Sequence, residues 1–155
     1  MKWIGPLFTN AGGWSAYVSY FDGEWYIDRD TPIKIGEGKS GVMLLPMMEK
    51  EYGDSYEKQI EILETGLVEN GFEASIAHTF PFHVPVIFPF EKRMARWAEM
   101  AAEWVPYIDL CEESAQLLFD MSQDKIVSQR ARQLLQKTVN RWSSERGYLL
   151  VRSQH

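Results

Sequence analysis

The sequence predicts an α+β fold, in which a small, mostly antiparallel sheet and one packed helix form the N-terminal half and a three-helix bundle follows. Residues 1–90 are rich in glycine, proline, aromatic and β-branched residues, whereas residues 91–155 read almost entirely as helix. This segregation favours α+β over an alternating α/β fold. The chain has 155 residues, no internal repeat and no low-complexity linker. We therefore expect residues 1–155 to form a single domain.

The clearest local signal is a β-hairpin. Residues 14–21 and 24–28 flank Asp22-Gly23, which is typical of a two-residue type I′ turn. This turn pairs Tyr20 with Trp25 and Val18 with Ile27, and it gives the hairpin an apolar core face. The opposite face mixes aromatic and acidic side chains, so it is either a docking surface or a second core covered by helices. The aromatic candidates for docking are Tyr17, Phe21 and Tyr26.

The remaining elements follow from periodicity and capping. A further strand is expected over 42–45, and a helix over 54–70, with Asp54 and Glu57 as a capping box. Residues 80–90 are apolar at every even position and carry three prolines at odd positions. This pattern predicts an edge strand with one blocked edge or, failing that, an extended apolar arm. Three helices are then expected over 91–105, 106–121 and 122–146, the last capped by Ser122 and ended by Gly147.

Charge is unevenly distributed along the chain. The formal net charge is −6, but residues 49–73 carry eight acidic and two basic residues, and residues 125–155 carry seven basic residues and one acidic residue. The acidic and basic segments either attract each other within the fold or face different partners.

Composition also bears on the cellular compartment of the protein and on its association with membranes. Its single cysteine, Cys111, cannot form an internal disulfide, and we expect it to be buried as a small hydrophobic residue on a helix face. The N-terminal apolar run is short and is broken by Pro6, unlike a signal peptide. No stretch approaches the roughly 18 apolar residues that a membrane span needs. These features predict a cytoplasmic protein without a membrane partner.

No motif indicates a catalytic or cofactor site. Gly36-Glu37-Gly38-Lys39-Ser40 lacks the first glycine of a P-loop, because that position is Ile33. His78 and His83 are five residues apart, so on an extended chain they point to opposite faces and cannot bind one metal ion together unless the chain turns at Pro81. We therefore expect no catalytic residue, no metal and no cofactor. A small hydrolase-type enzyme that uses His78 or His83 remains an alternative.

The function that we expect is non-catalytic binding of a macromolecule. An acidic protein of this size suits an inhibitor of the immunity or anti-defence type, which blocks a basic, nucleic-acid-handling protein by placing carboxylates in its phosphate sites. The carboxylates would come from Glu57, Glu61 and Glu64. A further alternative is nucleic-acid binding, because Arg130, Lys137 and Arg141 fall within about 40° of one another on the last helix. The sequence leaves the oligomeric state open, including a homodimer.

Overall fold

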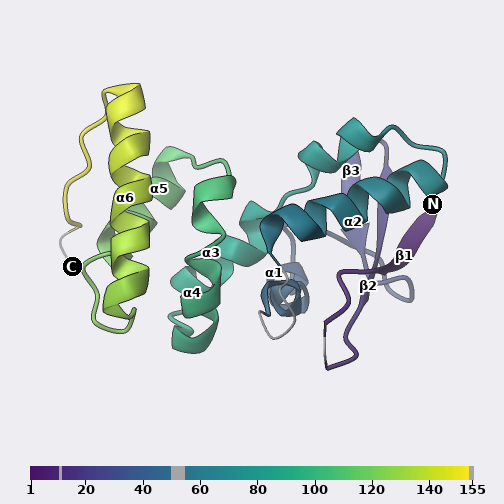
Figure 1. Ribbon diagram of the computed structural model, residues 1–155, viewed down its shortest axis with the longest axis horizontal. Coiled ribbons are helices and arrows are strands. Elements are labelled where there is room, and N and C mark those ends of the chain that lie inside the picture. The colour runs from purple at the N-terminus through teal and green to yellow at the C-terminus, as the bar shows by residue number, and fades with distance from the viewer. Residues whose placement is uncertain (11, 50–54, 154–155) are drawn as a thin grey trace. The chain divides into compact units, whose positions relative to one another are not determined.

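The computed structural model describes residues 1–10, 12–49 and 55–153, and the chain divides into two compact units, Met1–Pro85 and Val86–His155 (Figure 1). The first unit contains the sheet and the second contains the C-terminal helices. The predicted α+β class is confirmed, because all four strands of the sheet lie in the N-terminal half and the C-terminal half is helical.

The sheet of the first unit is antiparallel, with its strands in chain order. Its strands are β1 (Trp3–Leu7), β2 (Ala16–Phe21), β3 (Glu24–Ile27) and β4 (Ile33–Lys34). Asp22 and Gly23 connect β2 to β3 with φ angles of 52° and 77°, as a type I′ turn requires. Tyr20 lies opposite Trp25, and Val18 lies opposite Ile27. The predicted hairpin and its register are therefore confirmed.

One face of the sheet is the core of the first unit. Ile4, Val18 and Ile27 form a buried row across three strands. The helix α2 (Tyr56–Glu69) and the 3-10 helix η2 (Ala74–Thr79) belong to the same unit, and Figure 1 shows α2 running across the strands. The apolar side of α2 buries Ile60, Leu63 and Leu67.

The helix predicted over 54–70 is present as α2. Its N-cap is Ser55, whose hydroxyl accepts a hydrogen bond from the backbone N–H of Lys58 at 3.3 Å. Asp54, the predicted start, lies outside the described residues. A serine at the N-cap satisfies one of the free N–H groups of the first helical turn.

The strand predicted over 42–45 is wrong, because this segment forms the short helix α1 (Ser40–Met43) and then the 3-10 helix η1 (Leu45–Met48). Pro46 lies in the first turn of η1, where its missing N–H has no helical partner to lose. The apolar residues Leu44, Leu45, Met47 and Met48 are all buried. Burial of consecutive residues, rather than of alternate ones, explains why the segment is not a half-buried strand.

The edge strand or extended arm predicted over 80–90 is also wrong, because the segment forms α3 (His83–Glu91). Pro85 lies in the first turn, where it removes no helical hydrogen bond, and Pro89 lies inside the helix. Both Val86 and Phe90 are fully buried. A helix that is apolar on all sides is stable when it is buried, and this burial compensates for the hydrogen bond lost at Pro89.

The second unit contains α4 (Ala95–Ala101), the 3-10 helix η3 (Val105–Tyr107), α5 (Glu112–Met121) and α6 (Gln129–Arg146). Three helices were predicted here, and each is shorter than predicted. The N-cap of α6 is Ser128, not Ser122, and Gly147 ends the helix in the left-handed conformation as predicted. Within the described ranges, no helix combines the length and the apolarity that a bilayer crossing requires.

Candidate functional site

The boundary between the two units is also a boundary in charge. Residues 1–85 carry six Lys and Arg against thirteen Asp and Glu, a formal charge of −7, and residues 86–155 carry ten against nine, a charge of +1. The first unit therefore accounts for the acidity of the whole chain. A cationic molecule would be attracted to this unit more strongly than to the second.

The predicted acidic residues Glu57, Glu61 and Glu64 lie along the solvent side of α2 and are called the acidic ridge below. At 100° per residue they fall within about 60° of one another, away from the buried Leu63. Glu57 and Glu61 are exposed, and Glu64 is half-buried. In the part of the chain that the structure describes, neither Glu61 nor Glu64 forms an ion pair. Glu61 and Glu64 thus present charge that no cation among the described residues of the first unit neutralises.

A groove of about 420 Å³ runs between the acidic ridge and β1. From α2, Glu61 and Glu69 supply two carboxylates, Lys58 supplies one ammonium group and Ile62 supplies apolar surface, so the groove is acidic by one charge. Pro6 and Leu7 of β1 form the other wall. A long basic side chain can place its aliphatic stem on such apolar surface and its charged end near the carboxylates.

The predicted aromatic residues lie on the face of the sheet opposite to the core face. The register places Trp3, Ser19, Tyr26 and Lys34 in one row across the four strands. The side chain of Phe21 is 50% exposed, and Tyr17 and Tyr26 are half-buried. The guanidinium carbon of Arg29 lies 3.3 Å from the centre of the Tyr17 ring, a cation–π contact.

These two groups of predicted residues are not brought together. Glu57, Glu61 and Glu64 belong to the helix that packs on the core face, whereas Tyr17, Phe21 and Tyr26 lie on the other face of the sheet. One flat partner surface cannot contact both groups at once. They are two separate candidate surfaces.

The two histidines are exposed in neighbouring elements of the first unit. His78 lies in η2, and His83 is the first residue of α3. Both residues lie in helical segments, so the extended chain that the sequence analysis assumed between them is wrong. Among residues 1–10, 12–49 and 55–153, no group of three or more His, Cys, Asp and Glu side chains is placed to hold a metal ion.

Cys111 is exposed, so the prediction that it is buried on a helix face is wrong. The helix α5 begins at Glu112 rather than near residue 106, which makes Cys111 its N-cap. Its Sγ lies 3.4 Å from the hydroxyl of Ser114 and accepts a hydrogen bond from the Ser114 backbone N–H at 3.5 Å. The hydrogen bonds from Ser114 hold the pKa of the Cys111 thiol below its usual value.

The predicted basic residues on α6 differ in their surroundings. Arg130 donates from Nη2 to Oε1 of Glu99 at 2.8 Å and from Nη1 to Oε1 of Glu103 at 2.9 Å. Lys137 and Arg141 are exposed, and neither forms an ion pair within the described residues. Because Arg130 is already paired, two of the three charges are available to a phosphate.

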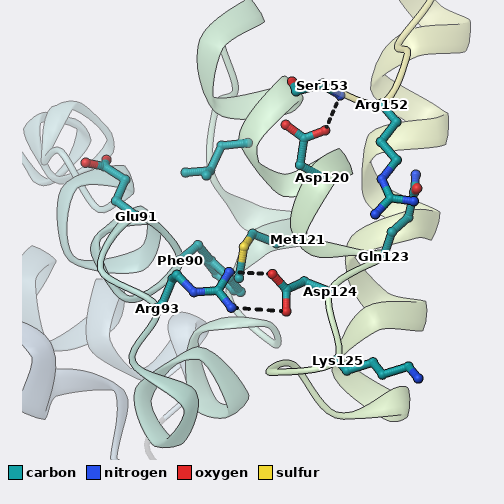
Figure 2. A pocket seen from close by; sticks show the side chains of 11 residues that line it. Phe90, Glu91, Arg93, Asp120, Met121, Gln123, Asp124, Lys125, Arg152 and Ser153 are labelled. Atoms are coloured by element: carbon teal, nitrogen blue, oxygen red, sulfur yellow. Dashed lines mark hydrogen bonds and ion pairs between the residues drawn. The ribbon is translucent and has the colours of Figure 1, made fainter. Parts of the chain in front are cut away.

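The second unit also contains a cavity of about 670 Å³ that no sequence pattern indicated (Figure 2). Four separate segments line it, and they contribute residues from the end of α3, from α5, from the loop after α5 and from the C-terminal segment. No single segment carries a recognisable motif. Only the folded structure brings these residues together.

No protein family, no characterised protein and no solved structure shows significant similarity to this chain.

Proposed function

We propose that the protein is a non-catalytic binding protein of the inhibitor or immunity type, whose acidic ridge binds a basic, nucleic-acid-handling protein. The observation that supports this proposal is the charge of −7 on the first unit, together with the exposure of Glu57 and Glu61 on one side of α2. A surface of one charge sign raises the rate at which an oppositely charged partner arrives.

The spacing of the ridge supports phosphate mimicry. With a rise of about 1.5 Å per residue, Glu57 and Glu61 are about 6 Å apart along the axis of α2, and Glu61 and Glu64 about 4.5 Å apart. One strand of DNA carries a phosphate about every 3.4 Å of axis. The ridge is thus a shorter and somewhat sparser line of negative charge of the same kind. A basic groove that follows a phosphate backbone would accept it.

The groove beside the ridge supplies what a line of charge lacks. Ile62, Pro6 and Leu7 offer apolar surface next to Glu61 and Glu69. Buried apolar contact slows dissociation, whereas exposed ion pairs contribute mainly to the association rate. A partner lysine or arginine inserted into this groove would make apolar contacts with its aliphatic stem and ion pairs with its charged end.

Affinity capture from lysate tests the proposal with three baits: the wild type, a ridge variant and a control variant. The ridge variant is Glu61→Lys/Glu64→Lys, and the control Asp109→Lys/Glu145→Lys makes the same change in net charge on exposed residues of the second unit. We expect one protein to be captured in stoichiometric amount by the wild type and the control, to survive nuclease treatment, and to be lost from the ridge variant. An empty capture, or equal loss from both variants, would contradict the proposal.

Nucleic-acid binding is the second candidate, and the exposure of Lys137 and Arg141 supports it. The same capture distinguishes it, because nucleic acid would then be recovered and would disappear on nuclease treatment. Lys137→Gln/Arg141→Gln would weaken this recovery and flatten its dependence on salt. The ridge variant would leave it unchanged or strengthen it.

A further inference from the structure

We propose that the cavity of the second unit binds a small zwitterion with an apolar body, such as a free apolar amino acid or a short peptide. The cavity measures about 670 Å³, within the range of roughly 300–1,000 Å³ that is usual for small-molecule sites. Its residues are not part of the acidic ridge, so the inference does not depend on the proposed function.

The apolar part of the cavity comes from three side chains. Phe90 at the end of α3 is 1% exposed and Met121 at the end of α5 is 5% exposed, while Leu117 on α5 is half-buried. A phenyl or branched aliphatic group in contact with these side chains would leave water. Methionine adapts to differently shaped apolar groups. This surface selects for an apolar body without fixing its exact shape.

One ion pair in the cavity is internally satisfied. Arg93 donates to both carboxylate oxygens of Asp124, as the dashed lines in Figure 2 show. The Oδ1 atom of Asp124 also accepts a hydrogen bond from the backbone N–H of Ile126 at 2.9 Å. Because these two charges neutralise each other, the ion pair connects two segments of the cavity wall and adds little net charge to it.

The remaining charges of the cavity are two acidic and two basic side chains. Within the described residues, Lys125, Arg152 and Glu91 form no ion pair. The backbone N–H of Ser153 and the side-chain amide of Gln116 both reach Oδ1 of Asp120, which leaves the charge of that carboxylate without a cation. An equal number of unpaired charges of each sign disfavours a ligand that carries one sign alone.

The unpaired charges lie on different sides of the cavity. Figure 2 shows Glu91 on the opposite side of the view from Arg152 and Lys125, with Asp120 near the top and the end groups of Glu91 and Lys125 turned outward. A ligand carboxylate would lie toward Arg152 and a ligand ammonium toward Asp120, while Glu91 and Lys125 act on the ligand through their charge at longer range. Its apolar body would then lie on Phe90, Leu117 and Met121.

The wall that carries Arg152 is held in place by hydrogen bonds on both sides of that residue. Nε2 of Gln116 donates to the carbonyl of Val151 at 2.7 Å, and the backbone N–H of Ser153 donates to Asp120 at 3.0 Å. Leu150 just before this segment is 8% exposed. Arg152 therefore extends from an anchored backbone, which lowers the entropy that ligand binding would have to offset.

Isothermal titration calorimetry of the full chain tests the proposal with three related probes. L-Phenylalanine carries both charges, 3-phenylpropanoate only the carboxylate and 2-phenylethylamine only the ammonium group. We expect L-phenylalanine to bind with a dissociation constant of about 1 mM or lower and to bind more tightly than either of the others. The proposal is overturned if no L-phenylalanine binding is detected in this range, or if 3-phenylpropanoate or 2-phenylethylamine binds as tightly.

Paired variants locate the binding. Arg152→Gln should weaken L-phenylalanine and 3-phenylpropanoate by about three- to fivefold and leave 2-phenylethylamine unchanged. Glu91→Gln should weaken the binding of L-phenylalanine and 2-phenylethylamine by about three- to fivefold and leave the binding of 3-phenylpropanoate unchanged. Arg146→Gln, at an exposed arginine that does not line the cavity, is the matched control. If Arg152→Gln and Glu91→Gln behave like this control, binding occurs elsewhere and the proposal is wrong.

A second readout does not depend on any substitution at a charged residue. The methyl resonance of Met121 in the wild-type protein should shift on addition of L-phenylalanine, because Met121 lines the cavity. Saturable binding without a shift of this resonance would also overturn the assignment.

Discussion

Ile4 of β1 and Gly66 of α2 are in such close contact that a Cβ atom at position 66 would lie 2.9 Å from Cγ2 of Ile4. Ile4 is 1% exposed and β-branched, so its side chain has little freedom to move aside. The glycine is therefore what allows α2 to approach the sheet. This approach places the acidic ridge and the neighbouring groove above β1.

Gly66→Ala should destabilise the protein even though alanine is the better helix former. The helix propensity of alanine favours the variant by about 1 kcal/mol, but overpacking of a core contact costs about 1–3 kcal/mol. We expect a net loss of up to about 2 kcal/mol in the free energy of unfolding, measured by urea denaturation. Thr65→Ala, at the exposed neighbouring position, should instead raise the free energy of unfolding slightly. Equal stability of the two variants would show that the contact relaxes without cost.

Asp124→Asn should reveal the ion pair at the edge of the cavity through the pH dependence of stability. The hydrogen bond from Arg93 holds the pKa of Asp124 below its usual range. A carboxyl group whose pKa is lower in the folded state stabilises the fold above its unfolded pKa of about 3.9, and this stabilisation is lost as the pH falls through the folded pKa. The asparagine keeps an oxygen for the Ile126 N–H, so the substitution removes mainly the charge.

We expect the variant to have a slightly lower free energy of unfolding than the wild type at pH 7, and the loss should be small because solvent screens the largely exposed Arg93 side chain. The difference from the wild type should shrink as the pH falls below about 4. Asp109→Asn, at an exposed carboxylate, should give no comparable difference at either pH. A loss that stays constant into acid would rule out the Arg93 pair as its cause.

Cys111 should react faster with iodoacetamide near neutral pH than an unperturbed thiol. The hydrogen bonds from Ser114 lower the pKa of Cys111, and the thiolate is the reactive form. The midpoint of the rate against pH should therefore lie lower in the folded chain than in the same chain unfolded in urea. Ser114→Ala removes the hydroxyl contact and should move the midpoint upward. An unchanged midpoint would mean that the hydroxyl does not stabilise the thiolate.

The hairpin was predictable because its determinants are local. Two residues, Asp22 and Gly23, adopt the positive φ angles that the turn requires, and the turn then fixes the register of both strands. The terminal Gly147 of α6 acts over a similarly short range and was predicted correctly, whereas the predicted N-cap, Ser122, was wrong because the helix begins after Ser128.

The segment of residues 80–90 was mispredicted because its proline spacing fits two structures. Prolines at 81, 85 and 89 share one edge of a strand, but residues four apart also lie within about 40° of one another on a helix. The apolar residues between them did not discriminate either, since a fully buried helix shows no polar side. The tertiary burial of Val86 and Phe90 decided the outcome.

The sequence predicted how the candidate residues lie within their own elements, but not how those elements are arranged. Periodicity placed Glu57, Glu61 and Glu64 on one side of a helix and Tyr17, Phe21 and Tyr26 on one face of a hairpin. It could not say which face of the sheet the helix would cover, and that choice separates the two groups. The cavity was not predictable at all, because Phe90, Asp120 and Arg152 come from segments with no shared periodicity.

Arg130 of α6 forms ion pairs with Glu99 of α4 and with Glu103, which follows that helix, and its substitution should therefore affect stability. The hydrogen bond with Glu99 raises the pKa of Arg130, so the arginine stays charged at every pH where the protein is studied. Arg130→Gln should lower the free energy of unfolding by about 0.5–1 kcal/mol at low salt, because the pair is half exposed. In 1 M salt the loss should fall, since the Debye length is then only about 3 Å.

Lys137→Gln on the same helix is the matched control, because Lys137 forms no ion pair within the described residues. We expect this variant to change the free energy of unfolding by less than about 0.5 kcal/mol at either salt concentration. If Arg130→Gln behaves in the same way, Arg130 is not committed to α4 and rejoins Lys137 and Arg141 as a third charge for a phosphate. If it is destabilising and salt-sensitive, only Lys137 and Arg141 of these three residues remain available to a phosphate. Two phosphate contacts would give a slope of log affinity against log salt of about −1.8, whereas three would give about −2.7.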